Sequence, residues 1–233
     1  MGFSALATTS SGFAASLGRV DQSVTREEAL RHAAEIAAAT DLPVSADLEN
    51  GFGDDPADVA ETIRGALEAG LAGGSVEDYS GAQGAVYDLG HAVARVAAAA
   101  EVAHAGDAHL VLTARAENYL YGRPDLDDTL ARLTAFRDAG ADVVYAPGMT
   151  SAEEIRTVVE AVGIPVNVLV RRGVPSTAEL ARLGVARISV GGHFAFTAMA
   201  ALIEAADEFR GTGTYSFVER SAQGAQAVRR AFS

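Results

Sequence analysis

The 233-residue chain contains no cysteine, no tryptophan and no lysine, so all 18 of its basic residues are arginine. Without cysteine it cannot form disulfides, thiolate zinc sites, iron–sulfur clusters or a cysteine nucleophile. Without lysine it cannot form a Schiff base or a lysine-containing phosphate loop. These absences exclude lysine-dependent aldolases, pyridoxal enzymes and the standard phosphate-loop NTPases.

Basic charge is also scarce, since 31 acidic residues outnumber the 18 arginines and give a net charge of −13. Such a chain repels nucleic-acid backbones and anionic bilayers, so we expect neither as a partner. No apolar run approaches the roughly 18 residues of a membrane span, and Met1 to Gly12 lacks the basic start of a signal peptide. We therefore expect a soluble, cytoplasmic protein.

Short apolar runs rich in β-branched residues recur along the chain and predict strands. Most of them lack polar alternation, which is typical of parallel strands covered on both faces. The seven predicted strands are Phe3–Thr9, Leu42–Leu48, Gly73–Glu77, His109–Arg115, Ala141–Ala146, Pro165–Val170 and Arg187–Val190.

Segments with helical spacing and start signals lie between these runs. Thr25 and Glu28 have the spacing of a capping box, and Asp55 followed by Pro56 suits an N-cap and a first helical position. The predicted helices run from Thr25 to about Ala39, from Asp55 to about Gly70, and over about Leu89–His104, Leu126–Ala139, Ser151–Val162 and Ser176–Leu183.

The alternation of strands and helices predicts an α/β fold, a single (β/α) barrel of the TIM type over residues 1–233. A doubly wound open sheet is the alternative. A barrel needs eight strands and the pattern supplies seven, so the first strand and helix are missing and the open edge favours association. Residues 211–233, with a helix over about Tyr215–Phe232, are expected to form an extra helical arm for an oligomer.

Acidic side chains follow neighbouring predicted strands at the points where the strands end. Asp47 and Glu49 follow one strand and Glu77 ends the next. In a (β/α) barrel these ends share one mouth, where close carboxylates repel unless a cation lies among them. Oxygen-only ligands suit Mg²⁺ or Mn²⁺. The competing interpretation is that these acids cap helices or face solvent.

Arg115 ends an otherwise apolar strand, where its guanidinium could hold a substrate carboxylate bidentately. A salt bridge to Glu117 or Glu77 is the alternative. Of the five histidines, only His193 follows the last strand and can reach the mouth, with a helix start as its competing role. The others, for which surface or packing roles are expected, are His32, His91, His104 and His109.

Seven strings that coincide with predicted strand ends resemble the isocitrate lyase and phosphoenolpyruvate mutase superfamily. In chain order they are TTSSGFAASLGRVD, PVSADLENGFG, SVED, TARAEN, GADVVYAPG, PVNVL and GVARISVGG. The resemblance implies a Mg²⁺-dependent α/β barrel that acts on small 2-oxo or 2-hydroxy acids. It implies cleavage or formation of a C–C or P–C bond through a metal-bound enolate of pyruvate, and dimers or tetramers with exchanged C-terminal helices.

The same resemblance assigns roles to individual residues. Asp47 is implied as the direct metal ligand, with Asp21, Glu49 and Glu77 completing its shell, partly through water. The substrate-binding set consists of the turn residues Thr9, Ser10 and Ser11, together with Asp47, Arg115 and Asn167. Arg115, Glu117 and Asp47 form the implied catalytic group.

The chain also departs from the superfamily pattern. The loop Asp78–Gly84 lacks the catalytic cysteine of the lyases and the lysine of the mutases. Isocitrate lyase, methylisocitrate lyase and phosphoenolpyruvate mutase in their usual forms are therefore disfavoured. Glu49 stands where a second aspartate is usual, and the missing first strand agrees with the count of seven.

The hypothesis that survives these departures is a Mg²⁺-dependent lyase for small 2-oxo or 2-hydroxy acids such as oxaloacetate. The metal chelates the carboxylate and 2-oxo oxygen of a pyruvate-like group, and Arg115 neutralises the distal carboxylate. Decarboxylation or retro-aldol cleavage then needs no cysteine, and a proton comes from water, Tyr79 or His193. The alternatives are a P–C bond enzyme, either a phosphonopyruvate mutase or a hydrolase, and an inactive homologue that binds metal and carboxylate.

Overall fold

The computed structural model describes residues 2–106 and 109–232, which fall into two compact units, Met1–Gly191 and Gly192–Ser233. The first unit carries the strands. The second consists of two helices, α8 (His193–Gly211) and α9 (Phe217–Ala231). The segment expected as a helical arm, residues 211–233, belongs to this second unit together with α8.

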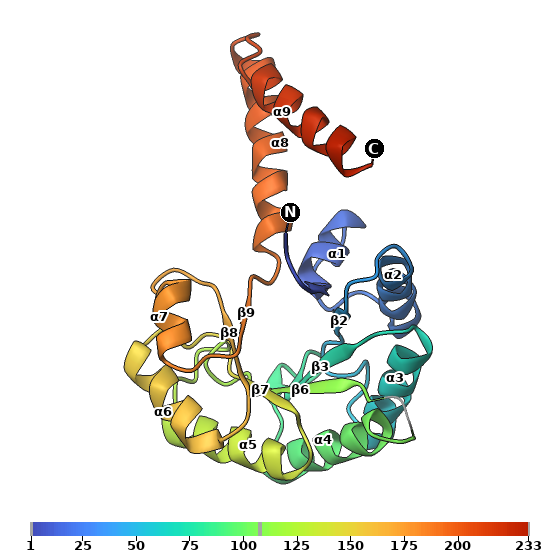
Figure 1. Ribbon diagram of the computed structural model, residues 1–233, viewed down its shortest axis with the longest axis vertical. Helices are drawn as coiled ribbons and strands as arrows, with labels where there is room; N and C mark the ends of the chain where they lie inside the picture. Colours follow the sequence, from blue (N-terminus) through green and yellow to red (C-terminus); the bar gives the residue numbers. More distant parts are fainter. Residues whose placement is uncertain (1, 107–108, 233) are drawn as a thin grey trace. The chain divides into compact units, whose positions relative to one another are not determined.

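The first unit is built on a seven-stranded parallel sheet that curls into a half-barrel, with helices α2 to α7 forming an outer arc around it (Figure 1). The α/β prediction is confirmed, and each of the seven predicted runs contains one of these strands. In sheet order they are β1 (Leu6–Ala7), β2 (Val44–Asp47), β3 (Gly73–Glu77), β6 (Val111–Arg115), β7 (Val143–Tyr145), β8 (Val166–Leu169) and β9 (Arg187–Ser189).

The sheet has two open edges, β1 and β9. β1 pairs only with β2, through Leu6 opposite Val44 and Ala7 opposite Ser45. Across residues 2–106 and 109–232, no backbone pairing joins β9 to β1. The sheet therefore matches the count of seven strands, one fewer than a closed (β/α) barrel requires.

Most helices lie where the sequence predicts them, and the predicted capping box is present. The Glu28 N–H donates to the Thr25 hydroxyl at 3.3 Å, and the Thr25 N–H donates to the Glu28 carboxylate at 3.0 Å. The helices of the first unit are α1 (Ser10–Ser16), α2 (Arg26–Ala38), α3 (Pro56–Glu68), α4 (Leu89–Ala103), α5 (Leu126–Asp138), α6 (Ala152–Val162) and α7 (Thr177–Arg182).

Besides α8, of which the sequence predicted no more than a start at His193, two elements differ from the sequence prediction. Thr9, Ser10 and Ser11 were expected in an anion-binding turn, but Thr9 is the N-cap of helix α1 and the chain is helical from Ser10. The short loop after Glu77 contains an antiparallel hairpin of β4 (Tyr79–Ser80) and β5 (Ala85–Val86). Each is too short to produce a hydrophobic period in the sequence.

The core lies between the sheet and its outer helices. Val44, Leu112 and Val144 on the strands are almost completely buried, as are Ile63 on α3 and Phe136 on α5. Burying each such side chain contributes about 1.5–3 kcal/mol to folding. This packing holds the strand ends, and hence the polar side chains on them, in fixed positions. Within the described chain, none of the helices combines the length and apolar character needed to cross a bilayer.

Candidate active site

A row of polar residues crosses the half-barrel at one level. Glu77, Arg115, Tyr145, Asn167 and Arg187 are successive register partners on β3, β6, β7, β8 and β9. Register partners in adjacent strands direct their side chains to the same face of a sheet. Glu77, Arg115 and Tyr145 are also the last residues of their strands. The row therefore reaches the carboxyl ends of β3, β6 and β7, where active sites of (β/α) barrels lie, whereas Arg187 is the first residue of β9.

Arg115 occupies the centre of a group of three carboxylates. Its Nε donates to Oε1 of Glu117 at 2.8 Å, one terminal nitrogen lies 3.0 Å from Oδ1 of Asp47, and the other lies 3.1 Å from Oε2 of Glu77. Its guanidinium carbon also lies 5.3 Å from the ring centroid of Tyr145. Asp47 and Glu77 thus meet at Arg115. The salt bridges of Arg115 to Glu77 and Glu117, considered as an alternative to substrate binding, are also present.

Carboxylates outnumber cations in this group, and two of the buried carboxyls have raised pKa values. Burial raises the pKa of Glu77 well above its ordinary value, although Arg115 opposes the shift. Burial likewise raises the pKa of Glu117, again against Arg115. The second oxygen of Glu117, Oε2, is buried and accepts no hydrogen bond from the described residues. The Arg115 guanidinium therefore leaves one carboxyl oxygen of the group without a partner among the described residues.

Glu49 contributes a fourth acid from an unusual backbone position. Its φ of +49° is in the left-handed region, which non-glycine residues rarely occupy and which concentrates at functional sites. In this conformation the Glu49 carbonyl accepts the Glu77 N–H at 2.9 Å. Burial, then the negative charges of Asp47 and Asp21, raise the pKa of the Glu49 carboxyl to about 8.

Asp47 is held from two sides. Its Oδ2 accepts the N–H of Ser10, the first residue of α1, at 3.1 Å, while its own N–H donates to the Thr8 hydroxyl at 3.0 Å. The Thr9 and Ser11 hydroxyls lie 3.2 Å from each other. The segment predicted to bind a substrate anion thus directs its first helical amide at the Asp47 carboxylate.

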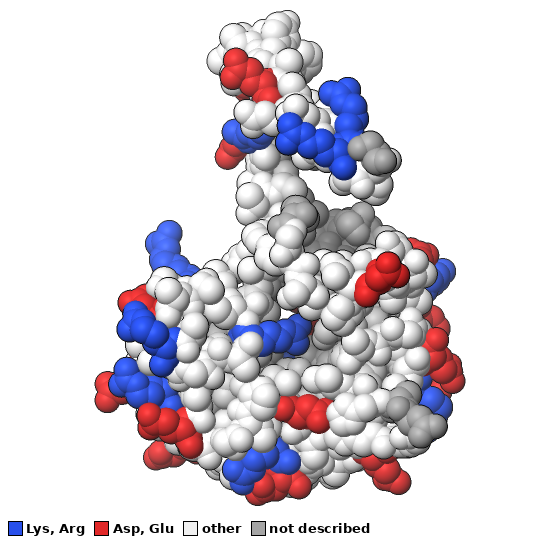
Figure 2. Space-filling view, in the orientation of Figure 1, with Lys and Arg blue, Asp and Glu red and all other residues white. Residues whose placement is uncertain are grey.

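Asp21, Glu49 and Glu77 line a cavity of about 960 Å³. Gln22 also lines it, and the Gln22 amide nitrogen lies 3.4 Å from Oε1 of Glu77 and 3.2 Å from the Tyr121 hydroxyl. Tyr121 stacks on Tyr79 with ring centroids 3.5 Å apart. The space-filling view shows a hollow in the middle of the first unit, with basic side-chain atoms at its margin (Figure 2).

The residues of the site fit a hard divalent cation. Asp47, Glu49 and Glu77 supply only oxygen donors, and the nearby buried Oε2 of Glu117 has no hydrogen-bond partner among the described residues. Mg²⁺ and Mn²⁺ prefer such donors. Asp21 is exposed at the rim and acts on Glu49 through its charge.

Two members of the polar row, Tyr145 and Arg187, were not among the predicted site residues. Burial raises the pKa of Tyr145 to about 12. Burial lowers the pKa of Arg187, against the effect of Tyr145, and Arg187 forms no ion pair with any residue that the structure describes. The alternation of Arg187 and Ser189 in the last strand is the signal that could have identified it.

Asn167 lies between these two residues in the row. Its amide nitrogen donates to the Ser189 hydroxyl at 3.0 Å, and its buried Oδ1 accepts no hydrogen bond from the described chain. Of the predicted proton donors, Tyr79 lies in the hairpin strand that follows Glu77 and Asp78. His193 begins helix α8 in the second unit.

A parallel half-barrel with acids and an arginine at its strand ends places its polar residues where α/β-barrel enzymes have their active sites. The family model described as phosphoenolpyruvate phosphomutase matches residues 1–210, and the chain belongs to this family. The resemblance to the phosphoenolpyruvate mutase and isocitrate lyase superfamily, whose members include carbon–carbon lyases and mutases, is thereby confirmed.

Three known proteins illustrate the relationship. A crystal structure from Burkholderia cenocepacia J2315, provisionally described as a lyase or mutase, is 56% identical, with a TM-score of 0.90 over 94% of this chain and 79% of that one. An uncharacterised protein of Mycobacterium tuberculosis is 32% identical over 82% of this chain and 70% of its own length. Oxaloacetate decarboxylase 2 of Pseudomonas fluorescens is 28% identical over 81% of this chain and 66% of its own length.

Proposed function

We propose that this protein is a Mg²⁺- or Mn²⁺-dependent lyase that cleaves a C–C bond of a small 2-oxo or 2-hydroxy dicarboxylic acid. The observation that carries the proposal is the convergence of Asp47, Glu77 and Glu117 on Arg115 at the strand ends. The similarity to an oxaloacetate decarboxylase supports a substituted pyruvate such as oxaloacetate as substrate.

Asp47, Glu49 and Glu77 would hold the divalent ion, with Asp21 contributing from the rim. When bound, the ion supplies a Lewis acid that stabilises negative charge developing on the 2-oxo oxygen of the substrate. Binding of a cation also lowers the electrostatic cost of ionising Glu49, whose pKa of about 8 otherwise favours the protonated form at neutral pH.

Arg115 positions the acids and contacts the substrate. Three of its N–H groups face Glu117, Asp47 and Glu77, which leaves two of the five guanidinium donors for a substrate carboxylate. Tyr145, with a pKa of about 12, remains protonated at neutral pH and donates a hydrogen bond to a substrate oxygen. Arg187 and Asn167 lie next in the row and bind the distal carboxylate.

For oxaloacetate, the bond between C3 and the distal carboxylate breaks. Its electron pair passes through C3 to the 2-oxo oxygen, and CO₂ leaves. A proton then adds to C3 and gives pyruvate. Tyr79, in the hairpin after β3, is one candidate donor of this proton, and water is the alternative. Comparison of Tyr79→Phe with the unaltered chain distinguishes them, because only a Tyr79 donor makes turnover depend on the hydroxyl.

The reaction is tested with a panel of oxaloacetate, substituted malates and phosphonopyruvate, with pyruvate detected by a coupled assay with and without Mg²⁺. We expect Mg²⁺-dependent pyruvate release from a member of the dicarboxylate series. Turnover of phosphonopyruvate alone would instead establish a P–C bond enzyme. Tight binding of oxalate and Mg²⁺ without any product would establish the inactive homologue and refute the lyase.

We also propose that the Gly192–Ser233 unit mediates a homodimer or homotetramer. Helices α8 and α9 expose large apolar side chains, among them Leu202 at 70%, Phe209 at 60% and Val218 at 55%. Burial of such surface favours self-association. Light scattering at several concentrations should give at least twice the monomer mass, and Leu202→Glu with Phe209→Glu should shift it toward the monomer. A monomer at all concentrations would contradict the proposal.

A further inference from the structure

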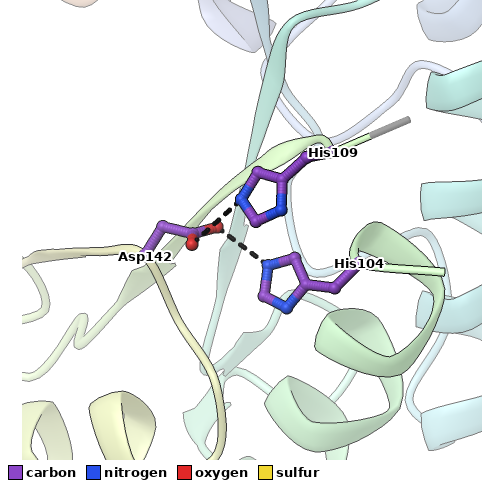
Figure 3. Close-up of side chains that lie close together, drawn as sticks. All are labelled: His104, His109 and Asp142. Carbon is purple, nitrogen blue, oxygen red and sulfur yellow. Dashed lines mark hydrogen bonds and ion pairs between the residues drawn. The ribbon is translucent and has the colours of Figure 1, made fainter. Parts of the chain in front are cut away.

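A second cluster of potential metal ligands lies at the opposite end of the strands. His104 is the C-cap of α4, His109 precedes β6 by two residues, and Asp142 immediately precedes β7. Figure 3 shows both imidazole rings directed at the two oxygens of the Asp142 carboxylate. Two histidines from one stretch of chain and an aspartate 33 residues after the second thus bring nitrogen and oxygen atoms close together.

The separations of these atoms suit a small metal ion. The Nε2 of His104 lies 3.0 Å from Oδ2 of Asp142, and the Nε2 of His109 lies 3.2 Å from Oδ1. One ligand atom from each residue lies within 4.8 Å of the others. Ligands that bind tetrahedrally at about 2.0–2.1 Å lie about 3.3–3.4 Å apart. The two nitrogen–oxygen separations are thus within a few tenths of an ångström of this spacing, and an ion also brings together ligand atoms that lie up to 4.8 Å apart.

The Asp142 carboxylate is also held in place before any ion binds. The backbone N–H of Leu112 donates to Oδ2 of Asp142 at 2.8 Å, which fixes the carboxylate against strand β6. The two imidazole rings stack with centroids 4.4 Å apart and planes at 2°, so one ring must rotate for both Nε2 atoms to point at the same ion. Hydrogen bonds from neighbouring groups that orient a ligand are typical of protein metal sites and strengthen ion binding.

We propose that His104, His109 and Asp142 form a site for Zn²⁺ or a similar late first-row divalent ion. Two imidazoles and one carboxylate match the ligand preference of these ions, whereas the oxygen-only group around Asp47 suits Mg²⁺. The side chain of His109 is 57% exposed, so an ion reaches the site from solvent and water completes the coordination.

This site is separate from the proposed active site. His109 and Asp142 precede the first residues of their strands, whereas Arg115 and Tyr145 are the last residues of the same strands. Strand β6 alone spans roughly 13 Å between its ends. The ion therefore takes no part in catalysis. It links the end of α4 to the start of β7. Because only the folded chain presents all three ligands together, ion binding stabilises the folded state.

The test is a calorimetric titration of the intact protein with Zn²⁺ in the presence of saturating Mg²⁺. We expect one Zn²⁺ per chain and a rise in thermal midpoint on binding. His109→Ala, a substitution of the most exposed ligand, should weaken Zn²⁺ binding at least about tenfold and abolish the rise. His193→Ala, in the second unit, is the matched control and should bind like the unaltered chain.

Asp47→Ala should bind Zn²⁺ with the same affinity as the unaltered chain. This result distinguishes the histidine cluster from the acidic group around Asp47. Equal Zn²⁺ affinity in the unaltered chain and in His109→Ala would overturn the proposal, as would the absence of saturable binding. Cu²⁺ bound to the unaltered protein provides a test that requires no substitution. Its electron paramagnetic resonance spectrum should show splitting by imidazole nitrogens, and a spectrum of oxygen ligands alone would also overturn the proposal.

Discussion

The Nε of Arg115 donates to Oε1 of Glu117 at 2.8 Å, and the Glu117 side chain is completely buried. The same guanidinium contacts Asp47 and Glu77, so it is the counter-charge that permits three acids to meet at the strand ends. Removal of one partner from a buried ion pair leaves an uncompensated charge, which costs more than the pair itself contributes.

Arg115→Met should therefore lower the free energy of unfolding by about 3–5 kcal/mol in metal-free protein. Added Mg²⁺ should recover part of this loss, because a second cation replaces the missing charge. Urea denaturation with EDTA and with excess Mg²⁺ measures both effects. Arg123→Met, at an exposed position, is the control and should change stability by less than about 0.5 kcal/mol. Equal stability of the two variants would show that the acids do not depend on Arg115.

Glu49 makes the stability of the metal-free protein depend on pH. Folding raises its pKa from an ordinary value near 4.5 to about 8, so the folded state binds the proton more tightly than the unfolded state. Stability from this group is complete below about pH 4.5 and is lost as the pH rises through about 8. Glu49→Gln removes the dependence.

The stabilising effect of Glu49→Gln should increase by roughly 2 kcal/mol between pH 6 and pH 9. Urea denaturation in EDTA at both pH values measures the change, with Glu68→Gln on the exposed surface of α3 as the control. A constant difference between Glu49→Gln and the unaltered chain across this range would mean that Glu49 ionises normally in the folded state.

Arg187 should act on substrate binding rather than on metal binding. Loss of a charge-assisted contact to a carboxylate corresponds to about a 10- to 100-fold increase in KM. Arg187→Met should show this increase for dicarboxylates. Its affinity for Mn²⁺ should stay unchanged. Steady-state kinetics and a metal titration provide the two measurements. Arg172→Met, at an exposed position three residues beyond β8, should leave both values unaltered. An unaltered KM in Arg187→Met would assign the distal carboxylate to another residue.

The sequence predicts the strands and most helices because their signals are local. Uninterrupted β-branched runs mark buried parallel strands such as Val111–Arg115, and capping residues such as Thr25 mark helix starts. Helix α1 was not predicted, because its seven residues are mostly small and show no amphipathic period. The hairpin of β4 and β5 was not predicted either, because two-residue strands have no pattern to detect.

The candidate site was predictable only in part, for a physical reason. Asp47, Glu77 and Arg115 end their strands, and chain topology alone brings strand ends together. Arg187 pairs with Asn167, and Asn167 with Tyr145, because of the register between neighbouring strands. The amino-acid sequence alone does not specify this register. The left-handed backbone at Glu49 likewise arises from contacts distant in the sequence, including the hydrogen bond from Glu77.

Direct measurement of metal binding tests the central claim that acids from neighbouring strands hold a divalent ion. The experiment is a Mn²⁺ titration followed by electron paramagnetic resonance, performed in the His109→Ala background so that the histidine cluster does not contribute. We predict one Mn²⁺ per chain, with Mg²⁺ competing, and loss of this binding when Asp47→Ala is added. Undiminished Mn²⁺ binding without the Asp47 carboxylate would contradict the account.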